Sequence, residues 1–514
     1  MSSRTTEAPS SAEPAVPKEA SLPRWAMFAL LFVLACAVAL RFLSLSPLWL
    51  DEAQTVEISR RSVSGLLSAL RHDGSPPLYY LLLHAWLKVF GTSSLAVRAL
   101  SGVFSVAALP LMWRAARHLG ASRRDAWVAT LLLATCPFAI RYATETRMYS
   151  LVVLLSLLAF LAFRRVWLDG GVGWIVLAAL CTAAMFLTHY WSLFLGVAVG
   201  VAALVVVRRQ RAPALRVLFS LALGSLGFVP WVPSFLFQLR HTGAPWGSPP
   251  SIAEPVLSPN AWSGSGPVGS DAALAFAYYV LVGLALVGTA TASGVLVGRR
   301  PRPVPSWLLG VAFGGLLLGS TVSLVLGSAY ASRYSSIALA PFLLVAASGF
   351  GAIPARWWLR AVGIVTVLGL VVSAALPAKP RSQADQVAAA LRNAKPHDVV
   401  VFCPDQLGPA VHRLAPHAGQ QVVYPTLGSP AMVDWVDYKT RNEAADPQAF
   451  AKDILARAAG SAIWLVYADG YPTFGDDCSR LLVAFGAARG QPHIVVRSHR
   501  RTDERDRVAY YRPG

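Results

Sequence analysis

The sequence predicts a mainly α-helical, polytopic membrane protein with a small α/β domain at its C-terminal end. Of the 514 residues, 55% are hydrophobic and only 14% are charged, whereas a soluble protein usually has about 25% charged residues. Apolar runs of membrane-crossing length recur as far as residue 377. After them, helical patterns alternate with the β-rich runs DVVVFC, QQVVY, AIWLVYA, HIVVRS and VAYY, as in an α/β domain.

Three regions follow from these patterns. Residues 1–23 contain no apolar run and are rich in Ser, Pro and Glu, so we expect a disordered cytoplasmic tail. Residues 24–377 form the predicted membrane domain, and residues 378–514 form a soluble domain outside the cytoplasm.

Eleven apolar runs in the membrane domain predict transmembrane helices. The arginine clusters between these runs all fall on one face, which is cytoplasmic by the positive-inside rule. The N-terminus is then inside and the C-terminal domain outside. These clusters contain most of the basic excess behind the net charge of +19. The charge therefore reflects membrane topology, and nucleic-acid binding is disfavoured. The predicted spans are 25–43, 95–113, 125–140, 148–163, 172–188, 190–207, 215–237, 272–297, 305–328, 334–352 and 359–377.

The stretch after the first span is too long for a turn and too mixed for a span. SVSGLLSAL (62–70) and PLYYLLLHAWLKVFG (77–91) have the pattern of amphipathic helices that lie in the membrane interface, with Tyr79, Tyr80 and Trp86 at the depth of the headgroups.

The five cysteines show no metal-binding spacing. Cys36, Cys136 and Cys181 lie in apolar runs, where cysteine packs as a small hydrophobic residue. Cys403 and Cys478 lie in the C-terminal domain and can form a disulfide if that domain is outside the cytoplasm.

The acidic residues of the membrane domain gather on its outer face. Carboxylates at a membrane surface suit a general base or a metal ligand. The alternative is that they are solvated loop ends, or ion pairs with Arg141 or Arg147. Seven of the nine carboxylates between residues 25 and 377 are placed outside by the predicted topology: Asp51, Glu52, Glu57, Asp73, Glu145, Glu254 and Asp271.

The Asp51–Glu52 pair in SPLWLDEAQT follows the first apolar run directly. Adjacent side chains on a helical turn point about 100° apart, so the two carboxylates cannot face one cleft equally. We expect one to address a substrate and the other to hold the loop through Arg60 or Arg61.

Two further groups of polar residues lie at the outer membrane edge. Arg333 and Tyr334 lie away from the cytoplasmic arginines, so Arg333 either binds an anion such as a lipid phosphate or snorkels to the surface. His189 and Tyr190 lie where the fifth and sixth spans meet. They contact a substrate or a metal, or they hydrogen-bond between helices.

The turn DGSPP is a third such place. It orients His72 and Asp73 towards the same surface, and the same two readings apply to them. In the outer loop 239–271, Trp246 and Trp262 either stack on a sugar ring or are ordinary interfacial aromatics.

Several of these motifs occur in the order found in bacterial glycosyltransferase family 39, and the chain resembles that family over residues 25–355. The members include protein O-mannosyltransferases and aminoarabinose transferases that modify lipid A, and they have the GT-C fold. The motifs that carry the resemblance are SPLWLDEAQT, DGSPPLYYLLLHAWLKVFGTSSLAVRALSGVFSV, RYATETRMYSL, THYWSLF and SRYSSIALAPFLL.

The resemblance implies an inverting transferase that moves a sugar from a polyprenyl-phosphate donor to an acceptor hydroxyl outside the bacterial plasma membrane. Asp51 matches the catalytic general base, Glu52 the second acid of the pair, and Glu145 the acid of the second outer loop. Arg333 matches a basic residue near the lipid phosphate. The candidate catalytic residues are therefore Asp51, Glu52 and Glu145. The candidate substrate-binding residues are His72, Asp73, Tyr79, Arg147, Tyr149, His189, Tyr190, Arg333 and Tyr334.

No cofactor is required by the sequence, although some GT-C enzymes use a divalent cation. The expected donor sugar resembles mannose or arabinose, and the acceptor is a glycolipid, a polysaccharide or a protein. A transporter, flippase or sensor is the alternative. Transporters place polar residues mid-membrane and have internal repeats, whereas here the acids line one face, which favours a transferase.

We expect the C-terminal domain to recognise the acceptor or a partner rather than to perform the chemistry. Its acidic residues Asp405, Asp469, Asp476 and Asp477 are expected to be solvated loop residues.

Overall fold

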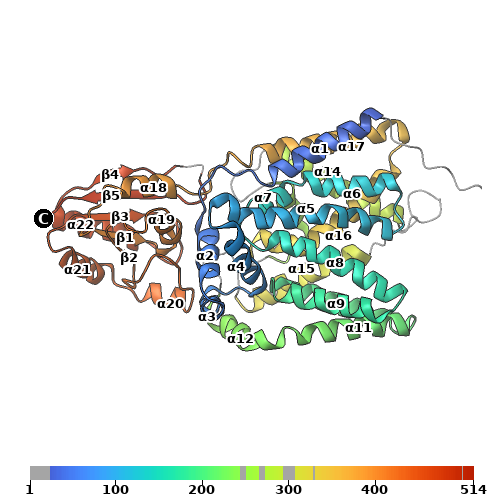
Figure 1. Ribbon diagram of the computed structural model, residues 1–514, viewed down its shortest axis with the longest axis horizontal. Coiled ribbons are helices and arrows are strands. Elements are labelled where there is room, and N and C mark those ends of the chain that lie inside the picture. The colour runs from blue at the N-terminus through green and yellow to red at the C-terminus, as the bar shows by residue number, and fades with distance from the viewer. Residues whose placement is uncertain (1–23, 244–250, 265–271, 293–306, 328–329, 500–501) are drawn as a thin grey trace, which may run out of the picture.

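The computed structural model describes residues 24–243, 251–264, 272–292, 307–327, 330–499 and 502–514. Helices dominate one end of the molecule and a small sheet domain forms the other, as Figure 1 shows. The predicted tail (1–23), Trp246, Asp271 and parts of the predicted spans 272–297 and 305–328 lie outside the described residues.

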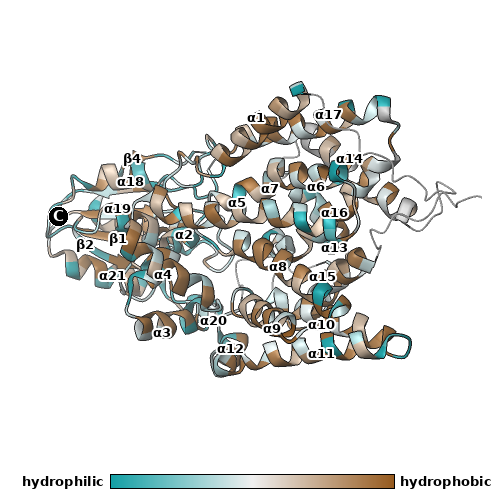
Figure 2. Cartoon of the chain, turned by 45° about the vertical axis from the view of Figure 1, so that its right-hand side comes forward, coloured by the Kyte–Doolittle hydropathy of each residue, from teal (hydrophilic) through white to brown (hydrophobic). Residues whose placement is uncertain are grey.

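Helices run side by side through the larger end of the molecule (Figure 1), and most of their residues are hydrophobic (Figure 2). Each of the predicted spans corresponds to a helix or to a bent pair of helices. These are α1 (Arg24–Leu40), α5 (Ser94–His118), α6 (Arg123–Thr135) with α7 (Pro137–Ala143), α8 (Tyr149–Leu168), α9 (Val172–Phe186), α10 (Trp191–Val206), α11 (Arg211–Leu226) with α12 (Val232–His241), α14 (Ala272–Ala292), α15 (Trp307–Val325), α16 (Ser336–Gly349) and α17 (Ala355–Ala374).

Not all of these helices are long enough to cross a bilayer alone. Within the described residues, α5, α8, α15 and α17 are each long and apolar enough to cross a membrane. Two bent pairs, α6–α7 with a 53° bend and α11–α12 with a 40° bend, raise the number to six if each pair is one span. Pro137 begins α7 and Pro230 lies in the break before α12, where proline interrupts the helical hydrogen bonds. The total of eleven spans stays a prediction.

Three short helices form the first outer loop: α2 (Leu50–Arg60), α3 (Val63–Asp73) and α4 (Leu78–Phe90). The amphipathic patterns predicted α3 and α4 to within a few residues. Tyr79 and Tyr80 do not lie on the surface of the protein, because both are fully buried, and their depth in the membrane stays a prediction. Tyr79 shares a hydrogen bond with Ser101 and Tyr80 donates one to Asp73. A buried hydroxyl needs such partners.

The C-terminal domain contains a five-stranded sheet in the order β2-β1-β3-β5-β4. Strand β1 pairs in parallel with β2 and β3, whereas β5 pairs antiparallel with β3 and β4. All five strands coincide with the predicted β-rich runs: β1 (Val399–Cys403), β2 (Gln420–Val423), β3 (Ile463–Tyr467), β4 (His493–Val496) and β5 (Arg507–Tyr511). The helices of the domain are α18 (Ala384–Leu391), α19 (Gly408–Leu414), α20 (Tyr438–Glu443), α21 (Pro447–Ala458) and α22 (Asp477–Arg489).

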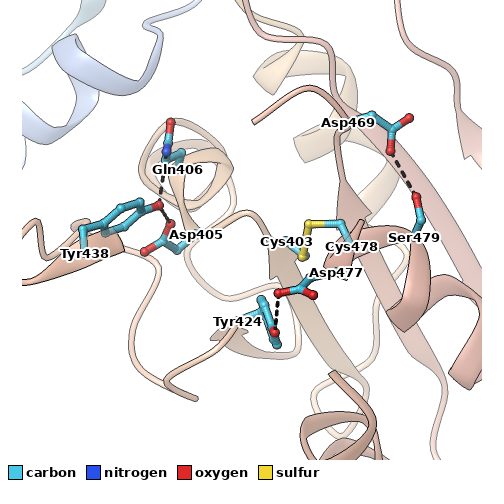
Figure 3. Close-up of a disulfide and its surroundings, with 9 residues drawn as sticks. All are labelled: Cys403, Asp405, Gln406, Tyr424, Tyr438, Asp469, Asp477, Cys478 and Ser479. Carbon is cyan, nitrogen blue, oxygen red and sulfur yellow. Dashed lines mark hydrogen bonds between the residues drawn. A yellow bond between two sulfur atoms is a disulfide. The ribbon is translucent and has the colours of Figure 1, made fainter. Parts of the chain in front are cut away.

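Cys403 and Cys478 form a disulfide that joins the end of β1 to the start of α22 (Figure 3). This is the pairing that the sequence left open. Asp469 and Asp476 are exposed, as expected. The expectation for Asp405 is wrong, because its side chain is buried and accepts a hydrogen bond from Tyr438. Burial raises the pKa of Asp405 to about 7.

The sheet domain lies directly against the first outer loop (Figure 1). Helix α19 packs on α2, and one apolar core includes Ala53 and Val56 of α2 together with Leu407 and Val411 of the domain. The C-terminal domain therefore covers the helix that carries the Asp-Glu pair.

Candidate active site

Helix α2 presents Asp51 in its first turn. The backbone N–H of Leu50 donates a hydrogen bond of 2.6 Å to a carboxylate oxygen of Glu504. This contact satisfies one of the N–H groups that a helix start leaves unpaired. A residue of the C-terminal domain thus fixes the start of the helix on which Asp51 lies.

Asp51 faces two arginines that come from different parts of the chain. Its Oδ2 lies 3.3 Å from Nη2 of Arg333 and 3.9 Å from Nε of Arg147. The side chains are 17% exposed for Asp51 and Arg333 and 11% exposed for Arg147. The carboxylate is therefore shielded from water yet accessible, between two guanidinium groups.

Arg147 is held in place by groups of the first outer loop. Its Nη1 donates hydrogen bonds to Thr55 at 3.0 Å and to Tyr80 at 3.1 Å. Tyr80 in turn donates to Asp73. The Nε of Arg147 is buried and has no hydrogen-bond partner among the described residues.

Glu52 has a different environment from its neighbour. Its side chain is fully buried, and Arg98 of α5 donates to both carboxylate oxygens, at 2.8 and 2.6 Å. The N–H of Thr146 donates a third hydrogen bond of 2.9 Å. Burial by itself would raise the pKa of Glu52, but Arg98, together with Arg381 and the N–H of Thr146, outweighs it and holds the pKa below its ordinary value.

Asp51 and Glu52 therefore have different environments, while the expectation that Asp51 addresses a substrate stays a prediction. Glu52 holds the loop through Arg98, whereas the expectation of Arg60 or Arg61 is wrong. Arg60 instead lies 3.8 Å from Glu57 on the protein surface.

Glu145 lies in the second outer loop, between α7 and α8, and is 1% exposed. Arg141 approaches it to 3.5 Å and Arg381 to 4.0 Å. Neither carboxylate oxygen has a hydrogen-bond partner among the described residues. Burial raises the pKa of Glu145 above its ordinary value, although both arginines act against this shift.

An aromatic group adjoins the two arginines. The ring of His189 lies 5.7 Å from that of Tyr149 and 5.1 Å from that of Tyr334. The N–H of Trp191 donates to Nδ1 of His189 at 3.2 Å, so in the neutral ring the proton is on Nε2. Burial, reinforced by Arg147 and Arg333, lowers the pKa of His189 to about 3.

Other candidate residues lie in the supports of the site rather than at Asp51. The Tyr190 hydroxyl donates to Gln238 and accepts from Trp231 at 2.9 Å, within the bundle. Tyr79 shares a hydrogen bond with Ser101, which itself donates to the carbonyl of Arg147.

His72 and Asp73 connect the first outer loop to the C-terminal domain. Nδ1 of His72 lies 3.0 Å from a carboxylate oxygen of Asp434. Asp73 accepts a hydrogen bond from Gln54, whose amide contacts the backbone of Val433 in both directions.

Trp262 is fully buried, and its Nε1 donates to Ser335 at 2.8 Å. A ring in that position does not stack on a sugar, so this expectation is wrong for Trp262.

Three charged residues of the site were not found from the sequence. Arg98 gave a signal, because a charge inside a predicted span needs a partner. Arg381 and Glu504 gave none, since they reach the site from the far end of the chain.

An apolar cavity of about 500 Å³ lies between α8, α9, α10, α11 and α15. Met185 and Ser192, on either side of the turn that contains His189, line one part of it. Arg164 and Gln210, at the opposite ends of α8 and α10, line another part. None of the described residues that line it is acidic. Among the residues described, no three His, Cys, Asp or Glu side chains are grouped so as to hold a metal ion.

Residues 74–234 match a known family, described as dolichyl-phosphate-mannose-protein mannosyltransferase. No curated protein matches the chain. Several solved structures share its fold.

The crystal structure of ArnT from Cupriavidus metallidurans in the apo state aligns with a TM-score of 0.61 and 14% identity, covering 95% of this chain and 98% of that one. The same protein bound to undecaprenyl phosphate aligns with a TM-score of 0.60 and 13% identity, covering 94% and 98%. The arabinofuranosyltransferase AftD from Mycobacteria aligns with a TM-score of 0.53 and 14% identity, covering 96% of this chain and 40% of that one.

Proposed function

Because this chain has the GT-C glycosyltransferase fold and a segment that matches the dolichyl-phosphate-mannose-protein mannosyltransferase family, we propose that it transfers a sugar from a polyprenyl-phosphate donor to an acceptor hydroxyl. The observation that carries the proposal is the half-buried carboxylate of Asp51 between the guanidinium groups of Arg333 and Arg147. This arrangement supplies a base and a phosphate site side by side.

The two arginines are assigned to the donor phosphate. Two guanidinium groups face one carboxylate, so this part of the site has an excess positive charge in a largely buried position. Guanidinium groups bind phosphate oxygens through paired hydrogen bonds. The Nε of Arg147 makes no hydrogen bond among the described residues, so it is a donor available to a phosphate oxygen.

Asp51 is assigned as the general base. It removes the proton from the acceptor hydroxyl, and the acceptor oxygen forms a bond to the anomeric carbon from the side opposite the phosphate. The bond from that carbon to the phosphate oxygen breaks, and its electron pair leaves with the polyprenyl phosphate. Arg333 and Arg147 stabilise the charge on the departing phosphate. The configuration of the sugar is inverted, and every step uses side chains of this chain.

The apolar cavity between α8, α9, α10, α11 and α15 is assigned to part of the polyprenyl chain. Its lining is almost wholly apolar, which suits a hydrocarbon. Met185 and Ser192 line it on either side of the turn with His189, and His189 contacts the ring of Tyr334, next to Arg333. This neighbourhood supports a lipid chain in the cavity and its phosphate at the arginines.

The site is proposed to lie on the outer face of a bacterial plasma membrane. The disulfide between Cys403 and Cys478 supports this placement, because structural disulfides persist in oxidising compartments. The donor sugar is proposed to be mannose or an arabinose-like sugar, and the acceptor a glycolipid, a polysaccharide or a protein.

The direct test is the release of polyprenyl phosphate by purified protein in lipid nanodiscs. Donors that carry labelled mannose or arabinose on undecaprenyl phosphate are incubated with membranes of a deletion strain as the acceptor source. We expect release, and labelled product, with at least one donor. Folded protein that binds the donors but releases nothing from any of them would contradict the proposal and favour a transporter or flippase.

A further inference from the structure

Arg381 comes from the segment between the last membrane helix and the sheet domain, yet it lies among the acidic residues of the outer loops. Its side chain is 1% exposed. Nη1 donates to the carbonyl of Thr144 at 2.7 Å, and Nη2 donates to the hydroxyl of the same residue at 2.6 Å. The guanidinium of Arg381 thus makes two hydrogen bonds to the residue directly before Glu145.

The backbone of Arg381 is fixed at the same time. Its N–H donates to the hydroxyl of Ser46 at 2.8 Å, and its carbonyl accepts from the N–H of Glu504 at 3.0 Å. Ser46 lies just before α2, and Glu504 holds the first residue of that helix. Arg381 therefore joins three parts of the chain that meet at the site: the segment before α2, the second outer loop and the C-terminal domain.

The charge of Arg381 lies between the two buried carboxylates. Its Nη1 is 3.8 Å from Glu52 and 4.0 Å from Glu145. Glu52 already has three hydrogen bonds from Arg98 and Thr146, whereas neither oxygen of Glu145 has a hydrogen-bond partner among the described residues. Loss of Arg381 would therefore act mainly on Glu145 and its loop.

We propose that Arg381 is a positioning residue that locks the second outer loop, with Glu145 and Arg147, against helix α2 and Asp51. It acts through Thr144 and through its charge, and it does not touch the reacting atoms. The docked C-terminal segment is then a working part of the site for every acceptor, in addition to any role in recognition. This inference rests on the proposed transferase function.

Two variants separate the geometry from the charge. Arg381→Lys keeps a positive charge but loses the planar fork that holds Thr144. Arg381→Gln loses the charge as well. A misplacement of about 1 Å in a catalytic group lowers turnover about 10²-fold. We expect kcat to fall about 10²-fold in Arg381→Gln and less in Arg381→Lys.

The pH profile distinguishes positioning from a general loss of structure. The charged groups that act on Glu145 are Arg141 of α7, Arg381, Glu52 of α2 and Arg333. Loss of the positive charge in Arg381→Gln makes the carboxyl group of Glu145 ionise less readily. Protonated Glu145 loses its ion pair with Arg141 and so loosens the loop that carries Arg147, which should move the acidic limb of the kcat profile to higher pH although Asp51 remains the base. Arg381→Lys should keep the wild-type limb.

Two further variants serve as controls. Arg507→Gln removes an arginine of the same domain that pairs with Asp469 at 2.7 Å, and it should keep wild-type kinetics. Thr144→Val removes the hydroxyl acceptor without changing any charge. Thr144→Val should lower kcat without a shift of the pH profile. If Arg381→Gln does not fold, this variant still tests whether the contact between Arg381 and Thr144 positions the loop.

Hydrogen exchange of the backbone amides at 144–148 gives a readout that needs no turnover. In Arg381→Lys these amides should exchange faster than in the wild type, and in Arg507→Gln they should not. If the wild type releases no polyprenyl phosphate, the proposed function fails. Amide exchange still tests whether Arg381 orders the second outer loop. Wild-type kcat, pH profile and exchange in folded Arg381 variants and in Thr144→Val would overturn the inference.

Discussion

Arg98 donates hydrogen bonds from two nitrogens to both carboxylate oxygens of Glu52, at 2.8 and 2.6 Å, and both side chains are almost fully buried. Arg98 also donates to the carbonyls of Ser46 and Pro47, so this ion pair ties the chain before α2 to helix α5. Asp51, one residue before Glu52, instead faces Arg333 and Arg147.

The Glu52→Gln variant should be strongly destabilised. Removal of one partner leaves the charge of Arg98 buried and uncompensated, which typically costs about 3–5 kcal/mol. The measurement is the thermal midpoint of the purified protein in detergent. Glu57→Gln is the matched control, because Glu57 pairs with Arg60 on the surface, where a pair is worth about 1 kcal/mol or less. Equal midpoints for the two variants would show that Glu52 does not hold the loop.

The Arg333→Gln variant should weaken donor binding. A hydrogen bond between charged groups contributes about 1.5–3 kcal/mol, so we expect the KM for the polyprenyl-phosphate donor to rise at least about tenfold. Arg333→Lys keeps the charge and should have a smaller effect. An unchanged KM in Arg333→Gln, measured with saturating acceptor, would remove this residue from the phosphate site.

His189 should make folding stability depend on pH. Burial lowers its pKa to about 3 in the folded protein, whereas the unfolded chain takes up a proton near pH 6.5. The unfolded state then binds more protons between these values, so stability present above pH 6.5 is lost as the pH falls.

His189→Gln removes this titration and keeps a neutral polar side chain. The stability lost in this variant, relative to the wild type, should be largest near pH 8 and should shrink towards pH 5. Thermal midpoints of both proteins across that range measure it. A difference that stays constant with pH would mean that His189 is not buried in its neutral form.

The orientation in the membrane is tested by cysteine labelling. Asn393 is exposed in the C-terminal domain and Arg209 is exposed after α10. A membrane-impermeant maleimide should label Asn393→Cys in intact cells and Arg209→Cys only after permeabilisation. The parent protein, whose Cys403 and Cys478 are joined, gives the background. The reverse pattern would overturn the predicted topology and place the site in the cytoplasm.

The sequence predicted the parts of the fold that have a local signal. Apolar runs located the membrane helices, and β-rich runs located all five strands. The 100° rule for adjacent helical side chains predicted that Asp51 and Glu52 would face different surroundings, as they do. The bends at Pro137 and Pro230 were not predicted, because proline in an apolar run does not reveal whether the chain turns.

The supports of the site could not be predicted, because they depend on tertiary contacts. Leu50 and Glu504 are 454 residues apart, and Ser46 and Arg381 are 335 apart. No pattern in a single sequence brings such residues together. Asp405 was misplaced for the same reason, since its buried position depends on a contact with Tyr438 of α20, 33 residues further along the chain.

The central claim is that Asp51 is the base of a sugar transfer, and Asp51→Asn tests it most directly. The substitution keeps the size of the side chain and removes its charge. Release of polyprenyl phosphate from a labelled donor should fall about 10²–10⁴-fold, the usual contribution of a positioned base, while the thermal midpoint and donor binding stay near wild type. If Asp51→Asn keeps wild-type turnover while Glu145→Gln is inactive, the base lies in the second outer loop and the assignment is wrong.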